Sequence, residues 1–295
     1  MHRFLKAAGF PDFMTEKTVY DFLEREVTVP ANFYSEVNID VETKVSEYRL
    51  MLTENIGVAA ALLRAGKRPP VLQYYYPFFE TFEETSTAPC TVERHTSMET
   101  YSGLIDDYSP GISLIFFMIN SLDYRRKLSA GADPLKTYSG SYLAAFANDG
   151  KVLLPIAKNR QDVIADIEAR KERRRLQEAA LAGDEDAGLK LDNEQVFLFD
   201  QVNERIHSED LYTLVDQTFI PWGVECDQYS VVGEIVAVEE AVNGYTGIPL
   251  WLLSVESNDV KFRVCMRKQD LLGEPFPGRR IKCGIWLHGH VNLET

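Results

Sequence analysis

The sequence predicts an α+β protein with an N-terminal antiparallel sheet and helices, a helical connector, and a small, OB-like C-terminal β-barrel. Two observations predict it. Residues 229–292 alternate apolar and polar positions between turn signals, as short barrel strands do. Residues 158–219 change to a helical period and are rich in good helix formers. We therefore expect an α+β domain over 1–157, a helical connector packing on it over 158–225, and a barrel domain over 226–295.

Composition limits the class of protein. The chain has 295 residues, of which 45% are hydrophobic and 26% charged, a composition typical of soluble globular proteins. Its net charge of -14 disfavours broad binding to nucleic acid or anionic membranes, because the field of the whole protein repels polyanions. The longest apolar run, Ile112 to Ile119, is far shorter than the ~20 residues that cross a bilayer.

Cysteine usage and the first residues indicate the compartment. The cysteines have no close spacing, which favours reduced thiols over a disulfide framework. The first ten residues contain no long apolar core of the kind that export signals carry. We therefore expect a cytoplasmic protein without a membrane segment. The four cysteines are Cys90, Cys226, Cys265 and Cys283.

The first domain begins with helices and continues as strands. Thr15 suits a helix N-cap, and Val19 and Phe22 follow it at helical spacing. From residue 33 the period changes to two, which predicts half-buried strands. The stretch Asn55 to Leu63 fits a helix or a strand. Asn148-Asp149-Gly150 predicts a hairpin turn, because these residues tolerate positive φ, and so favours antiparallel connections.

The connector is predicted as three helices. The first spans Asn159 to Ala182 and the second ends at Ile206, while the third begins at Ser208 and continues to Pro221. The barrel is then predicted as four strands with turns between them: Val231–Val238, Ile248–Val255, Val260–Met266 and Arg280–Val291.

Alternation assigns two faces to the last barrel strands. One face carries Phe262, Val264 and Met266 on one strand and Ile281, Cys283, Ile285 and Leu287 on the other. The opposite face would be basic and would carry a large ring and two imidazoles. This candidate binding face consists of Lys261, Arg263, Arg267, Arg280, Lys282, Trp286, His288 and His290.

The candidate binding face has two interpretations. It could bind an anion or single-stranded nucleic acid, with bases stacked on Trp286. Alternatively, its cations could keep the barrel exterior soluble or face the acidic remainder of the chain. Residues 226–295 have a net charge of -2 and residues 1–225 of -12, so the second interpretation agrees better with the charge.

A second candidate surface is aromatic. Tyr74, Tyr75 and Tyr76 lie in one predicted strand and could contact a protein partner or a second copy of the chain. Such a run is also typical of ordinary core packing.

Motifs for a metal or cofactor are missing from the sequence. His288 and His290 have a spacing that metals use, but no third ligand is visible. Phosphate loops, dinucleotide fingerprints and hydrolase elbows are also missing. We therefore expect no cofactor and no metal, and catalytic residues cannot be named from motifs.

Three stretches together resemble an uncharacterised bacterial family of about this length, a domain of unknown function. They are Met1 to Phe10, Phe219 to Tyr229, and Asp270 to Pro275 running into Gly278-Arg279-Arg280. The resemblance implies a bacterial, intracellular protein and assigns no activity, cofactor or site.

The sequence leaves three classes of function open. The first is a non-catalytic binding or regulatory protein, which the missing catalytic motifs favour. The second is an enzyme, for example a hydrolase, whose dispersed site would lie between the two domains. The third is a single-stranded nucleic-acid or anion binder that uses the candidate binding face.

Overall fold

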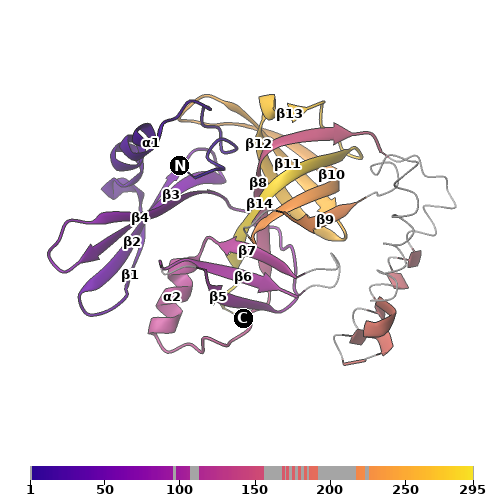
Figure 1. Cartoon of the computed structure of the whole chain (residues 1–295), viewed down its shortest axis with the longest axis horizontal. Coiled ribbons are helices and arrows are strands. Elements are labelled where there is room, and N and C mark those ends of the chain that lie inside the picture. The colour runs from indigo at the N-terminus through magenta and orange to yellow at the C-terminus, as the bar shows by residue number, and fades with distance from the viewer. Residues whose placement is uncertain are drawn as a thin grey trace.

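The computed structural model describes residues 2–95, 98–106, 113–155, 217–222 and 226–294, with short stretches between residues 168 and 191. The protein is mostly β, with a four-stranded antiparallel sheet and a closed five-stranded barrel (Figure 1). The predicted sheet and barrel are thus confirmed. In the described residues no helix is long and apolar enough to cross a membrane.

The N-terminal helix covers one end of the first sheet. Helix α1, Glu16–Phe22, begins at Thr15, whose side chain accepts a hydrogen bond from the Thr18 amide, so the predicted N-cap is confirmed. A π-helical turn, η1 at Leu23–Val27, and a 3-10 turn, η2 at Pro30–Asn32, follow it. The sheet is an antiparallel meander of β1 Phe33–Asn38, β2 Thr43–Met51, β3 Ile56–Ala65 and β4 Val71–Phe79. The ambiguous stretch from Asn55 is therefore a strand.

The barrel closes with a strand from the first half of the chain. Its ring runs β8–β12–β11–β10–β14 and returns to β8. A closed ring with an odd number of strands must contain a parallel pair, and here β8 and β12 are parallel. The strands are β8 Ser141–Leu153, β10 Gln228–Val242, β11 Pro249–Ser257, β12 Val260–Arg267 and β14 Arg280–Val291.

Shorter strands extend this sheet beyond the barrel. The end of β14 pairs in parallel with β7, Leu114–Met118, which continues to β6, Tyr101–Ile105, and β5, Cys90–Arg94. Two further short strands, β9 Thr218–Pro221 and β13 Leu271–Leu272, pair with β10 and β8, and η3 spans Lys268–Asp270. Helix α2, Ser121–Ser129, follows β7 and lies against β1.

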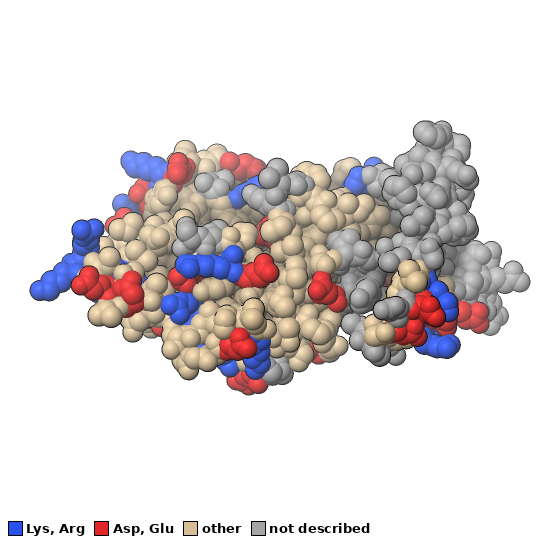
Figure 2. All heavy atoms as spheres, turned by 60° about the horizontal axis from the view of Figure 1, so that its bottom comes forward, with Lys and Arg blue, Asp and Glu red and all other residues tan. Residues whose placement is uncertain are grey.

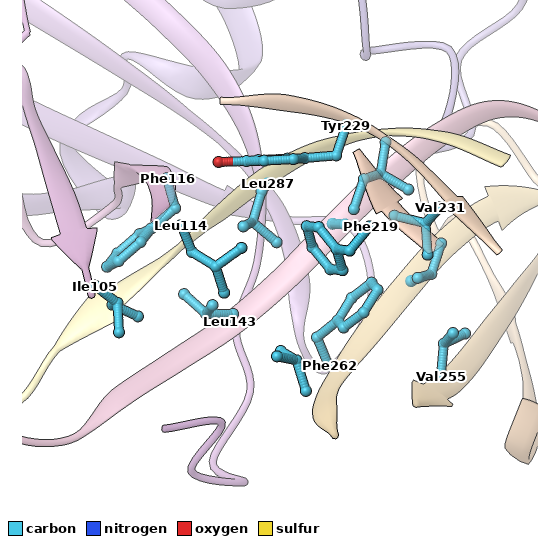
Figure 3. Close-up of a cluster of buried hydrophobic side chains, with 14 of the residues drawn as sticks. Ile105, Leu114, Phe116, Leu143, Phe219, Tyr229, Val231, Val255, Phe262 and Leu287 are labelled. Atoms are coloured by element: carbon cyan, nitrogen blue, oxygen red, sulfur yellow. The ribbon is translucent and has the colours of Figure 1, made fainter. Parts of the chain in front are cut away.

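Apolar side chains from all five strands fill the barrel (Figure 3). Val231, Val255 and Phe262 point into the core, and Phe219 of β9 packs edge-on against Phe262 at 5.5 Å. The face predicted for β12 and β14 is confirmed, because every residue assigned to it belongs to this core.

The outer face of the barrel is covered by the rest of the chain. A second core contains Phe146 of β8, Leu252 of β11 and Trp286 of β14. Phe4 of the N-terminal segment and Phe78 of β4 belong to the same core. The barrel and the four-stranded sheet therefore share one buried layer.

The predicted hairpin at Asn148-Asp149-Gly150 is wrong, because these residues lie within β8. Opposite Cys283 and Ile285 of β14, the paired residues of β8 are Gly150 and Ala147, so β8 carries one extra residue. A Cβ at Gly150 would lie 2.9 Å from the terminal methyl of Met266. The triplet thus marks a bulge, at which glycine lets the strand approach the core.

Two points about the helices differ from the prediction. Residues 218–221 form strand β9 and not the end of a helix, because Phe219 is buried against the barrel. Helix α2 was not predicted. In the connector, the described residues between 168 and 191 are helical except at Gly183 and Asp184. The predicted helices over 192–206 and from Ser208 fall outside the described residues.

Candidate functional site

The candidate binding face is not a single exposed surface. Arg267, Arg280, Trp286 and His288 are all less than 7% exposed. Lys261 is exposed, while Arg263, Lys282 and His290 are partly buried. The reason is the N-terminal part of the chain, which covers the outer face of β12 and β14.

Arg267 binds this covering segment. Its guanidinium contacts both carboxylate oxygens of Asp12 at 2.9 and 3.0 Å and forms a 2.6 Å ion pair with Asp270. It also donates to the Phe10 carbonyl at 3.0 Å. Lys261 and Arg263 likewise form ion pairs, with Glu83 at 3.5 Å and Glu239 at 3.0 Å. These cations therefore interact with acids of their own chain.

Trp286 and His288 lie inside the shared core. The Trp286 indole donates to Asp227 at 2.8 Å, and its ring stacks with Phe4 at 5.9 Å. His288 Nε2 accepts a hydrogen bond from the Phe79 amide at 2.9 Å, and burial lowers its pKa to about 3. The imidazole is neutral at pH 7 and ties β4 to the barrel.

The described surface has no broad basic region on the face drawn in Figure 2, where acidic and basic side chains are interspersed. Trp286, the ring expected to stack with bases, is buried. Stacking of nucleic-acid bases needs an exposed ring next to cations. The arrangement of the described residues does not provide one at this face.

The three tyrosines of β4 are buried or form hydrogen bonds within the chain. Tyr76 is 2% exposed and donates to Glu47 at 3.2 Å. The Tyr75 hydroxyl accepts from the His2 amide at 2.9 Å, and Tyr74 donates to the Glu99 carbonyl at 3.3 Å. All three thus serve internal packing.

Three of the four cysteine thiols are poor nucleophiles. Cys90, Cys265 and Cys283 are buried and unpaired. Burial raises the pKa of Cys90 to about 11 and that of Cys283 to about 12. His95 contacts the Ser102 hydroxyl at 3.1 Å and not a thiol. No group of three metal-ligating side chains occurs among the described residues.

A cavity of about 530 Å³ lies where α2, β8 and β14 meet, and we call it the junction hollow. Its walls come from the first half of the chain and from the barrel. Its lining includes Phe82, Asp123, Lys127, Tyr142, His290 and Glu294.

Tyr142 and His290 form one wall of the junction hollow. Their rings stack almost in parallel, with centroids 4.6 Å apart and planes 3° from each other. Burial lowers the pKa of His290, and the charge of Arg49 acts in the same direction. At pH 7 His290 is therefore a neutral imidazole. Its side chain forms no hydrogen bond with another described residue.

Charged groups of both signs face the same cavity. Lys127 donates to the Leu293 carbonyl at 2.6 Å and retains two further N–H groups. Asp123 accepts from Arg126 at 3.1 Å, and Glu294 is exposed at the rim. Asn120 donates to the Val291 carbonyl at 2.9 Å, which fixes α2 to β14.

A buried ionic network stands behind this wall. Arg49 of β2 pairs with Glu47 at 2.8 Å and Glu80 at 2.9 Å, and it donates to the Ile119 carbonyl at 2.7 Å. Burial raises the pKa of Glu47, although the charge of Arg49 lowers it. This network holds the loop before α2, and so fixes one side of the junction hollow.

Of the eight residues of the candidate binding face, only His290 lines the junction hollow. Sequence reasoning missed Asp123 and Lys127 because it did not recognise α2. The sequence does contain a signal for this helix: an Asn-Ser pair is followed by the helix-favouring residues Leu122 to Leu128. Tyr142 was missed because its place opposite His290 depends on the pairing of β8 with β14.

Comparison with known proteins gives one match. A family model covers residues 5–289, nearly the whole chain, and confirms the resemblance predicted from the sequence. No curated protein and no solved structure matches the chain. The chain belongs to the family described as "Domain of unknown function, E. rectale Gene description (DUF3881)".

Proposed function

We propose that the protein is a non-catalytic binding protein whose ligand occupies the junction hollow. The observation that carries this proposal is the stacked pair of Tyr142 and His290, which lines a cavity of about 530 Å³ between two parts of the fold. Cavities of roughly 300–1,000 Å³ are typical of small-molecule sites.

The lining argues for a small zwitterion that carries a ring. Tyr142, His290 and the 80% exposed Phe82 offer ring faces. Lys127 offers N–H donors to a carboxylate, while Asp123 and Glu294 attract an ammonium group. The neutral imidazole can donate one hydrogen bond and accept another.

We favour a binding protein over an enzyme, because the described residues place no nucleophile in hydrogen-bond contact with His290 or Tyr142. Among the described residues, neither His290 nor the Tyr142 hydroxyl forms a hydrogen bond to a serine, threonine or cysteine. An enzyme stays the second candidate, because a neutral imidazole in a cavity can act as a general base. Turnover of a bound ester that is lost in His290→Gln and kept in His95→Gln would favour the enzyme.

We also propose that the protein is a cytoplasmic, bacterial α+β protein with an OB-like barrel. A closed ring of five strands in non-sequential order supports an OB-like barrel, and α1 and α2 beside the first sheet support the α+β class. Three buried, unpaired cysteines agree with a cytoplasmic, bacterial protein. The burial of Trp286 supports a ligand other than nucleic acid.

Calorimetric titration with L-tryptophan, L-tyrosine and the truncated analogue tryptamine tests the proposal. We expect L-tryptophan or L-tyrosine to bind, and Tyr142→Ala to weaken binding about fivefold through lost stacking. Lys127→Met should weaken it about tenfold by removing the carboxylate contact. Tryptamine has no carboxylate and should be insensitive to Lys127→Met.

The matched control is Lys67→Met, because Lys67 is exposed on the turn between β3 and β4. It should bind both amino acids as the wild type does. If neither amino acid binds, or if the two lysine variants behave alike, the proposal is wrong.

A further inference from the structure

A cavity of about 470 Å³ lies between the N-terminal segment, helix α1 with its extension η1, and the turn that joins β10 to β11. We call it the α1 hollow. Among the described residues, none lines both this cavity and the junction hollow. Aromatic rings from three separate segments of the chain meet at the α1 hollow, and they are those of Phe10, Phe13, Phe22 and Tyr245.

Three of these rings pack against one another at an angle. The ring centroid of Phe22 lies 5.1 Å from that of Phe10 and 4.8 Å from that of Tyr245, with planes inclined by 67° and 56°. Phe10 and Phe22 are buried, Tyr245 is 51% exposed and Phe13 is 84% exposed. Because the planes are inclined, the ring faces look in different directions, as in sites where several rings surround one cation.

The turn that carries Tyr245 is fixed in place. The side chain of Asn243 donates to the Ala8 carbonyl at 2.8 Å and accepts from the amides of Tyr245 and Thr246 at 2.9 and 3.0 Å. The Thr246 hydroxyl donates to the Gly9 carbonyl at 2.6 Å. The turn is thereby tied to the N-terminal segment, so a ligand need not order it, which favours binding.

The charge at the rim of the α1 hollow is negative. Asp21 and Glu26 contribute two carboxylates, and Arg25 is the one base among the described lining residues. None of these three side chains forms an ion pair or a hydrogen bond with another described residue. Residues 16–27 as a whole contain four acids and two bases. The cavity therefore favours a positively charged ligand.

A π-helical turn supplies part of this rim. In η1 the Thr28 amide donates to the Leu23 carbonyl at 2.8 Å, five residues back along the chain. Arg25 and Glu26 belong to this turn and line the cavity. Single π-helical turns are rare and occur frequently at functional sites, which agrees with a ligand at this place.

We propose that the α1 hollow binds an organic cation with apolar groups on its nitrogen, of the class of quaternary ammonium compounds. The quadrupoles of the aromatic rings attract such a cation, and the carboxylates of Asp21 and Glu26 add to this attraction. A neutral ligand of the same shape would lose both attractions. An anion would meet two carboxylates against one guanidinium. The site and the class of ligand are independent of those proposed for the junction hollow.

Three compounds of similar shape and different charge test this site in the full chain. They are choline, its neutral analogue 3,3-dimethylbutan-1-ol, and 3,3-dimethylbutanoate, titrated by calorimetry. We expect choline to bind about tenfold more tightly than the alcohol, which corresponds to about 1.4 kcal/mol and agrees with cation–π contacts in a partly desolvated site. The carboxylate should bind most weakly. Equal affinity for choline and the alcohol would overturn the proposal, as would no binding of choline or tighter binding of the carboxylate.

Variants of exposed residues locate the binding. Tyr245→Ala should raise the Kd of choline about fivefold by removing one ring. Its matched control is Tyr20→Ala, a tyrosine of α1 that is 47% exposed and lies outside the lining. The double variant Asp21→Asn/Glu26→Gln should raise the Kd about tenfold, and its control is Glu24→Gln, exposed on η1. Both controls should leave the Kd unchanged, and thermal unfolding shows whether each variant is folded. An unchanged Kd in folded Tyr245→Ala or in the folded double variant would contradict the site.

The two proposed sites can fail separately. Tyr142→Ala should weaken binding of L-tryptophan and leave the Kd of choline unchanged, and Tyr245→Ala should show the reverse. If Tyr142→Ala weakens binding of choline and Tyr245→Ala does not, choline occupies the junction hollow and the α1 hollow is not its site.

Discussion

At the scale of single residues, the ion pair of Arg49 and Glu47 carries the largest expected effect on stability. Both side chains are at most 8% exposed, and Glu47 also accepts a hydrogen bond from the Tyr76 hydroxyl. Burying two charges costs several kcal/mol, which their mutual attraction offsets only while both are present. Removal of one partner is therefore worse than removal of both.

Arg49→Met should lower the free energy of unfolding by about 3–5 kcal/mol, because Glu47 would stay buried without its partner. The double variant Glu47→Gln/Arg49→Met should recover part of this loss. Urea unfolding of the two single variants and the double variant measures the coupling. Additive effects would show that the pair does not interact energetically.

His288 gives stability a defined pH dependence. Its pKa is about 3 in the folded protein because of burial, and about 6.5 in the unfolded chain. Between these values the unfolded chain takes up a proton that the folded protein does not. Stability contributed by the neutral imidazole is thus present above the unfolded pKa and is lost as the pH falls, by about 1.4 kcal/mol per pH unit.

His288→Gln should remove this slope, and the exposed His95→Gln should not. Urea unfolding from about pH 6 to pH 4 measures the free energy of unfolding for the wild type and both variants. The glutamine amide can still accept the Phe79 hydrogen bond, so the variant should fold. An unchanged slope in His288→Gln would contradict burial of a neutral imidazole.

At the scale of elements, the N-terminal segment is held by side chains of the barrel. Carbonyl groups of Ala8 and Phe10 accept hydrogen bonds from Asn243 at 2.8 Å and Arg267 at 3.0 Å. The segment also contributes Phe4 to the shared core. A short irregular stretch is thereby as well buried as a strand.

Arg267→Leu should loosen this segment, because it removes the contact to the Phe10 carbonyl and both carboxylate partners. Hydrogen exchange of the amides of residues 4–10 should accelerate relative to that of β11. Asp12→Asn is the control, since Arg267 keeps its hydrogen bonds to Asp270 and to the Phe10 carbonyl in that variant. Equal acceleration in both variants would show that Asp12 alone holds the segment.

The sequence predicted the elements that depend on local signals. The Thr15 cap and the apolar face of β12 follow from the residues themselves, because capping and alternation are local. The burial of Trp286 and His288 was missed, because strand alternation shows only which face a side chain is on. A side chain on the outer face is exposed only if no other part of the chain covers that face. Likewise, the junction hollow depends on long-range pairing of β8 with β14, which no local pattern contains.

At the scale of the whole molecule, the barrel and the first sheet should unfold together. Strand β8 closes the barrel from residues 141–153, and one core joins both sheets. The urea unfolding curve measured by tryptophan fluorescence should coincide with the curve measured by circular dichroism. Two separate transitions would instead support independent domains over 1–157 and 226–295.

The junction hollow lies where α2 meets the barrel strands β8 and β14. NMR spectra of the histidine rings during a titration with L-tryptophan test occupation of this cavity most directly. We predict that the ring signals of His290 shift with saturation, while those of His95 stay in place. Signals of His290 that do not move when L-tryptophan binds would contradict a ligand site in the junction hollow.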